Sequence, residues 1–161
     1  RVTLRILPAP SGSGIHFVRV DLNNFKIPAD WRHVARVSYA TSLMREGVLL
    51  STTEHLLSAL YASRIDNARI EIDNLEVPIG DGSADIFVSL LKNAGVKRLR
   101  RHRRYVRIKK TVAIDAGKNH IHIIPDDKFR ITCRTDFGHS FAGPEEISIS
   151  VDPTIFASKI A

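Results

Sequence analysis

The strongest constraint on the fold is a change of hydrophobic period within residues 1–96. Segments with an alternating, β-rich pattern come first, and a helical period begins near Thr52. The alternating segment ARIEIDN follows, and a second helical segment, ADIFVSLLKNAG, ends at Gly95. Since a sheet must bury one face, this order predicts an α+β unit over residues 1–96, with two helices covering one side of a mainly antiparallel sheet.

Turn residues suggest how the strands of this unit connect. RVTLRIL and GIHFVRVDL flank the turn-forming PAPSGSG, so we expect these two strands to pair. The proline of IPADW favours a short or edge element. VARVSYATSLMREGVLLST predicts two strands around a turn at residues 45–47. In the first helix, the spacing predicts an apolar stripe of Leu56, Leu57, Leu60 and Tyr61.

Strand patterns resume after residue 104, which predicts a second α+β unit over residues 105–161. Its strand segments are YVRIKKTVAID, HIHII, KFRITCRTDF and EEISISVD. No helix pair follows before Ala161, so we expect this unit to be incomplete, with apolar strands left uncovered. Cys133 lies in an alternating segment, which favours strand packing over a nucleophilic role.

The net charge of +7 comes from one local run. Residues 97–110 hold nine of the 24 Lys and Arg residues and none of the 17 acidic ones. We interpret the run as a solvated connector between the two units, which could also contact an anionic membrane surface transiently. The alternative is a nucleic-acid or anionic-surface binding module, but only Tyr105 is available there to stack on bases.

Composition limits the remaining classes. No run approaches the ~20 apolar residues of a membrane span. One cysteine excludes an internal disulfide and a zinc site built on several thiolates, and it fits a reducing compartment, so we expect a cytoplasmic protein.

The segment STTEHLLSAL, residues 51–60, offers two interpretations. Ser51 and Glu54 have the spacing of a capping box, which explains the glutamate but not His55. The positive end of a helix disfavours a protonated ring, and a neutral imidazole is a metal ligand. Adjacent helical residues point about 100° apart, so His55 could bind a metal while Glu54 faces a water. A capping glutamate beside a half-buried histidine remains the structural alternative.

Further ligands for a catalytic zinc, which needs about three, are hard to find. His120 and His122 would share one face of a strand, which suits a metal or simply an exposed polar face. His139 follows a strand end in DFGHS. The other histidines, which complete no ligand set, are His16, His33 and His102.

Two more residues are candidates for supporting roles. Asp81 either forms a turn in which Ser83 caps the second helix, or orients a metal-site histidine. Thr41 is by pattern a strand threonine.

Four segments in order, LPAPSGSGIHFVRVDL, STTEHLLSAL, IDNARIEIDNLEVPIGDGSADIFVSLL and DFGHS, resemble the UDP-3-O-acyl-N-acetylglucosamine deacetylases, zinc amidohydrolases of lipid A synthesis. TEHLLSAL and EVPIGDGSA are the most specific pieces. The family usually has Val where this chain has Thr53, and it differs again at residues 138–140. Neither departure touches Glu54 or His55.

The resemblance implies a fold of two α+β units packed face to face, with zinc between them. It implies that His55 is a zinc ligand and Glu54 the general base, places Thr41 near a substrate-facing insert, and favours the supporting role of Asp81. The other two ligands and the acid belong to a later HKxxD-type motif and a further histidine, which this sequence lacks. The chain therefore resembles the N-terminal portion of the family, apparently truncated at both ends.

We accordingly predict a zinc-dependent deacetylase that removes acetate from an acylated UDP-sugar and works as a monomer. This chain alone is expected to be inactive. A non-catalytic protein with the deacetylase fold and the basic binding module described above are the alternatives.

Overall fold

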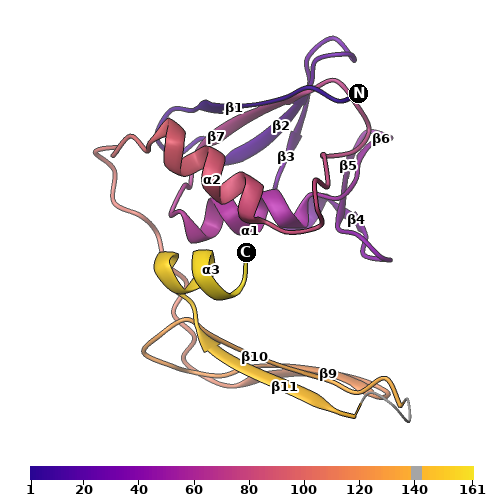
Figure 1. Ribbon diagram of the computed structural model, residues 1–161, viewed down its shortest axis with the longest axis vertical. Helices are drawn as coiled ribbons and strands as arrows, with labels where there is room; N and C mark the ends of the chain where they lie inside the picture. Colours follow the sequence, from indigo (N-terminus) through magenta and orange to yellow (C-terminus); the bar gives the residue numbers. More distant parts are fainter. Residues whose placement is uncertain (139–142) are drawn as a thin grey trace. The chain divides into compact units, whose positions relative to one another are not determined.

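The computed structural model describes residues 1–138 and 143–161 (Figure 1). The chain divides into two compact units, one of Arg1–His102 with Ala157–Ala161 and one of Arg103–Phe156. Strands and helices are mixed along the chain, so the predicted α+β class is confirmed. Among the described residues, no helix is long and apolar enough to cross a membrane.

A four-stranded sheet forms the centre of the first unit. Its strands are β1 (Leu4–Pro8), β2 (Ile15–Arg19), β3 (Phe25–Pro28) and β7 (Ala68–Ile72). Their order is β1-β7-β2-β3, with β7 antiparallel to β1 and parallel to β2. β3 lies at the edge of the sheet, as its proline predicts.

The predicted pairing of β1 with β2 is wrong, because β7 lies between them. Ala68, Ile70 and Ile72 of β7 are all buried, so the alternating apolar residues of ARIEI form the buried face of an interior strand. Asn67, just before β7, binds the loop from β1 to β2. Its Oδ1 accepts hydrogen bonds from the amides of Gly12 and Gly14 at 2.8 and 3.1 Å.

A smaller three-stranded sheet contains β4 (Val34–Arg36), β5 (Ser42–Arg45) and β6 (Val48–Leu50), and the 3-10 helix η1 (Trp31–His33) precedes it. The predicted turn between β5 and β6 is confirmed, with positive φ at Glu46 and Gly47. Arg19, only 7% exposed, connects the two sheets, because it donates to the Leu49 carbonyl at 3.2 Å and to both carboxylate oxygens of Asp21. These bonds hold the pKa of Asp21 below its usual range.

Two helices, α1 (Glu54–Ala62) and α2 (Asp85–Ala94), lie together across one face of the four-stranded sheet (Figure 1). α1 buries Leu56 and Leu60, as predicted, but Tyr61 is 49% exposed and lies outside the buried stripe. Small residues, Ala59 and Ala62, are buried instead, which lets the helix approach its neighbours closely. The fully buried large apolar side chains of this unit are Phe17, Ile27, Leu43, Leu50, Leu56, Leu60, Ile70 and Ile72.

The second unit contains two antiparallel hairpins. One joins β8 (Val112–Ala116) to β9 (Asn119–Ile123), and the other joins β10 (Arg130–Thr135) to β11 (Glu145–Ser150). In the β8–β9 hairpin, the cross-strand apolar pairs Val112 with Ile123 and Ile114 with Ile121 remain about half exposed or more. Cys133 lies on β10 as predicted, but it is exposed rather than packed.

A third helix, α3 (Pro153–Lys159), was not predicted. Its start has a readable signal, because Asp152 precedes a proline at the first helical position. The Asp152 carboxylate accepts hydrogen bonds from the amides of Thr154 and Ile155 at 2.8 and 2.9 Å, as an N-cap does.

His16 on β2 couples the stability of the first unit to pH. The side chain is 7% exposed, and among the described residues its Nδ1 has no hydrogen-bond partner. Burial, reinforced by the nearby charges of Lys26 and Arg69, lowers the pKa of His16 from 6.5. The folded state therefore keeps the ring neutral in a range where the unfolded chain binds a proton.

We predict that the free energy of unfolding decreases as the pH falls below about 6.5, because the unfolded state then binds more protons than the folded state. The contribution of the neutral His16 ring to the free energy of unfolding is fully present above that pH. It is lost as the pH falls toward the pKa of His16 in the folded state. Denaturant unfolding at several pH values tests this, with His16→Gln as the comparison. Equal pH dependence in the two proteins would contradict the assignment to His16.

Candidate functional site

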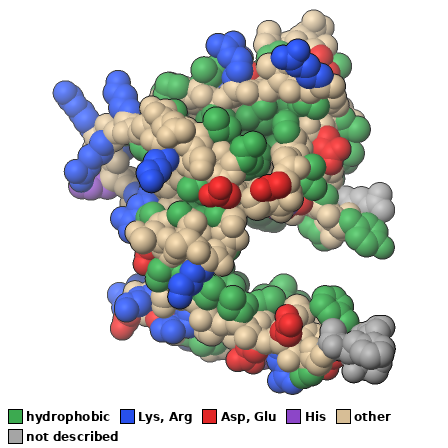
Figure 2. Space-filling model, in the orientation of Figure 1, with side chains coloured by type: hydrophobic (Ala, Val, Ile, Leu, Met, Phe, Trp, Pro, Cys, Tyr) green, Lys and Arg blue, Asp and Glu red, His purple; other side chains and the backbone are tan. Residues whose placement is uncertain are grey.

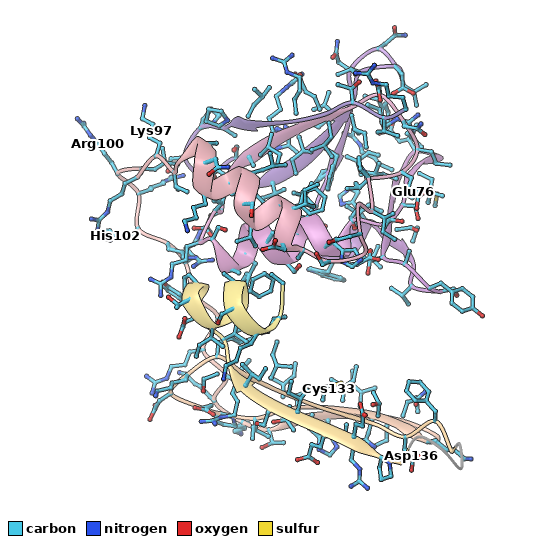
Figure 3. The ribbon with its side chains drawn as sticks, in the orientation of Figure 1. Glu76, Lys97, Arg100, His102, Cys133 and Asp136 are labelled. Carbon is cyan, nitrogen blue, oxygen red and sulfur yellow. The ribbon has the colours of Figure 1, made fainter. Side chains whose placement is uncertain are left out.

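The chain turns sharply at Thr52, between β6 and α1. Thr52 has a φ of +59° and is 4% exposed. A β-branched residue rarely adopts this left-handed conformation, which costs roughly 1–3 kcal/mol and must be held by its surroundings. Figure 3 labels Glu76, whose carboxylate accepts a hydrogen bond from Thr52.

Two sets of hydrogen bonds attach the turn to the segment after β7. The backbone of Ser51 forms a parallel bridge there, because its amide donates to the Leu75 carbonyl at 2.9 Å and its carbonyl accepts from the Val77 amide at 3.1 Å. The hydroxyl of Thr52 then donates to Oε1 of Glu76 at 2.6 Å. This length is typical of a hydroxyl bound to a carboxylate, which is a strong kind of hydrogen bond.

Further hydrogen bonds attach the start of α1 to Thr41. Thr53 is fully buried, and both its amide and its hydroxyl donate to the Thr41 carbonyl, at 3.1 and 2.9 Å. The amide of Thr41 in turn donates to Oε2 of Glu54 at 2.9 Å. One oxygen of the Glu54 carboxylate is therefore fixed by backbone, while Oε1 has no partner among the described residues.

The predicted capping box is wrong. α1 begins at Glu54 with Thr53 before it, and no side chain caps its amides. Ser51 instead lies back in the bridge to residues 75–77, and its hydroxyl lies 3.2 Å from that of Ser42. The positive φ at Thr52 separates Ser51 from the helix, so the glutamate carboxylate reaches Thr41 instead.

His55 follows Glu54 in the first turn of α1 and is half-buried. Its carbonyl accepts a hydrogen bond from the Ser58 hydroxyl at 2.8 Å, within the helix. Within residues 1–138 and 143–161, no three His, Cys, Asp or Glu side chains are grouped so that they could hold a metal. The described residues therefore form no complete metal centre around His55, and its role as a zinc ligand stays a prediction.

Asp81 lies in the turn before α2, as one interpretation of GDGSA predicts. Its Oδ1 accepts from the amide and the hydroxyl of Ser83 at 3.0 and 2.8 Å, and these bonds lower the pKa of Asp81. The Ser83 hydroxyl accepts from the Asp85 amide at 3.2 Å, although the residue before the helix is Ala84. The role of Asp81 toward a metal-site histidine stays a prediction.

The other histidines have different surroundings. Nδ1 of His33 lies 3.0 Å from the Asp30 carboxylate in η1. His120 and His122 share an exposed face of β9, with ring centroids 5.3 Å apart, and Nε2 of His122 lies 3.8 Å from the Asp115 carboxylate. His139 lies outside the described residues.

The basic run, residues 97–110, is mostly exposed and contains no helix or strand. Figure 2 shows its Lys and Arg side chains projecting from the surface, and Figure 3 labels Lys97, Arg100 and His102 there. The Arg103 guanidinium lies 5.6 Å from the centre of the Tyr105 ring. The structure thus presents this run as an exposed cationic segment.

Comparison with known proteins identifies the family. The model of the UDP-3-O-acyl N-acetylglycosamine deacetylase family matches residues 1–161. The chain belongs to this family. It is 54% identical over 160 residues to the UDP-3-O-acyl-N-acetylglucosamine deacetylase of Solibacter usitatus (strain Ellin6076), which covers 99% of the chain and 54% of that relative.

A second deacetylase of the same name, from Myxococcus xanthus (strain DK1622), is 41% identical over 162 residues, covering 100% of the chain and 52% of the relative. A third, from Saccharophagus degradans (strain 2-40 / ATCC 43961 / DSM 17024), is 40% identical over 153 residues, covering 94% of the chain and 50% of the relative. The chain thus spans about half the length of the relatives it matches.

Proposed function

We propose that the full protein removes acetate from UDP-3-O-acyl-N-acetylglucosamine in lipid A biosynthesis, in a zinc-dependent reaction. The observation that supports this most directly is the Glu54 carboxylate, which has one oxygen fixed by the Thr41 amide and sits beside the half-buried His55. The names of the relatives supply the substrate. Because the chain covers about half of each relative, the remaining site groups would come from the rest of the protein.

The residues present fit a part of a zinc site. His55 has the right chemistry for one ligand, and it lies in the first turn of α1. Zinc, when bound, would supply a Lewis acid and make water a better nucleophile near neutral pH. Glu54 would take a proton from the attacking water through Oε1, while the Thr41 amide keeps the carboxylate in one orientation.

In the full protein, Glu54→Gln should keep zinc but lose about 10²-fold or more in turnover, because the amide keeps the shape and removes the base. His55→Ala should instead lose zinc. Metal content and acetate release, measured on the same preparations, separate the two effects. A zinc-loaded Glu54→Gln protein with near-normal turnover would mean that Glu54 serves only to bind Thr41.

The 161-residue chain alone should show no deacetylase activity and only weak zinc binding. A catalytic zinc site needs about three protein ligands, and His55 is one. The half-exposed apolar pairs of the β8–β9 hairpin should also favour aggregation. Acetate release by the purified 161 residues that disappears in His55→Ala would refute this prediction.

We also propose that the protein is cytoplasmic and monomeric, binds no nucleic acid, and touches the membrane surface transiently through residues 97–110. The exposed cations support the last point, because each basic residue near an anionic surface contributes roughly 1 kcal/mol of attraction. Val96 and Tyr105, 59% and 78% exposed, add apolar area beside them.

Sedimentation with anionic vesicles should therefore retain the full protein at low salt and release it at high salt. Reversing the charges of Arg100, Arg101, Arg103 and Arg104 should abolish retention. Equal retention on neutral vesicles would contradict the proposed contact with an anionic membrane surface. Salt-dependent binding to RNA in place of vesicles would contradict it as well.

A further inference from the structure

Glu76 has a feature that the deacetylase chemistry does not use. It is exposed, yet its Oε1 accepts a short hydrogen bond from the buried hydroxyl of Thr52. The two flanking residues, Leu75 and Val77, already join this segment to Ser51 through backbone bonds. The side chain of Glu76 is therefore not needed to pair the two segments, and its bond acts on Thr52 alone.

Thr52 controls the direction in which α1 leaves β6. The residue before it belongs to the bridge with residues 75–77, and the residue after it binds the Thr41 carbonyl twice. Thr52, with its left-handed φ, connects these two fixed positions, and Glu54 follows two residues later. A relaxed, extended Thr52 would send the chain in another direction and move Glu54 away from the Thr41 amide.

We infer that Glu76 is a positioning residue for the general base. Its carboxylate holds Thr52 in the left-handed conformation, and this conformation places the Glu54 carboxylate where the Thr41 amide fixes it. The inference rests on the proposed role of Glu54. It assigns Glu76 no contact with substrate or metal.

The main test measures kcat, KM and zinc content of the full protein. Glu76→Ala and Thr52→Val should each lower kcat about ten-fold with little change in KM or zinc content, because a displaced base slows the chemical step without weakening substrate binding. Glu76→Gln should lose less, since its amide oxygen still accepts the Thr52 hydroxyl. Glu71→Gln is a matched control, because the carboxylate of Glu71 pairs with Arg5 and Arg69 on the sheet.

Two double variants distinguish positioning from general damage to the fold. Glycine adopts a left-handed φ without strain, so Thr52→Gly combined with Glu76→Ala should be more active than Glu76→Ala alone. In a Glu54→Gln background, Glu76→Ala should cause no further loss, because the group that it positions is already removed.

The inference is overturned if Glu76→Ala leaves kcat unchanged, if it loses zinc, or if it lowers the residual rate of Glu54→Gln by the same ten-fold factor. These outcomes leave the proposed function intact. The proposed function fails separately if Glu54→Gln alone keeps near-normal turnover, whatever the Glu76 variants do.

Discussion

The hydrogen bonds to Thr41 are the interaction on which the candidate site depends. The carbonyl of this residue receives two donors from Thr53, and its amide binds Glu54. Thr41 directly precedes β5, so the small three-stranded sheet and the first helix meet at the backbone of this one residue. Because these bonds are made by backbone, any side chain at position 41 that permits the same backbone conformation could support them.

The start of α1 illustrates how a site can take precedence over helix stability. A capping box would stabilise the helix with the residues available, yet the structure uses those residues otherwise. Ser51 joins a bridge, Thr52 adopts a strained conformation, and Glu54 binds an amide outside the helix. Strain held by surrounding bonds is a recurrent property of functional sites, and here it lies next to the two residues that motif reasoning selected.

The sequence predicted the elements of the fold better than their arrangement. Period and turn residues correctly located β7, α2 and the β5–β6 turn, because these signals are local. The neighbour of β1 could not be read locally, since the loop after it pairs with Asn67 rather than forming a hairpin. Similarly, the motif pointed to Glu54 and His55, but nothing in the spacing of residues 51–54 reveals a left-handed threonine or a bond to Glu76. α3 is different, because its start does carry a local signal, in which Asp152 caps the helix and a proline follows it.

The place of β7 in the sheet has a consequence for the order of folding during synthesis. β1 has β7 as its only strand partner in the described sheet, and their registers join Leu4 to Ile72 and Pro8 to Ala68. Since contacts between residues far apart in sequence form slowly, β1 must wait until the chain as far as Ile72 has left the ribosome. Until then, β2 and β3 can form only a hairpin, and the apolar face that α1 and α2 cover has no complete sheet beneath it. The nascent chain would therefore depend most on chaperones in the interval before Ile72 emerges.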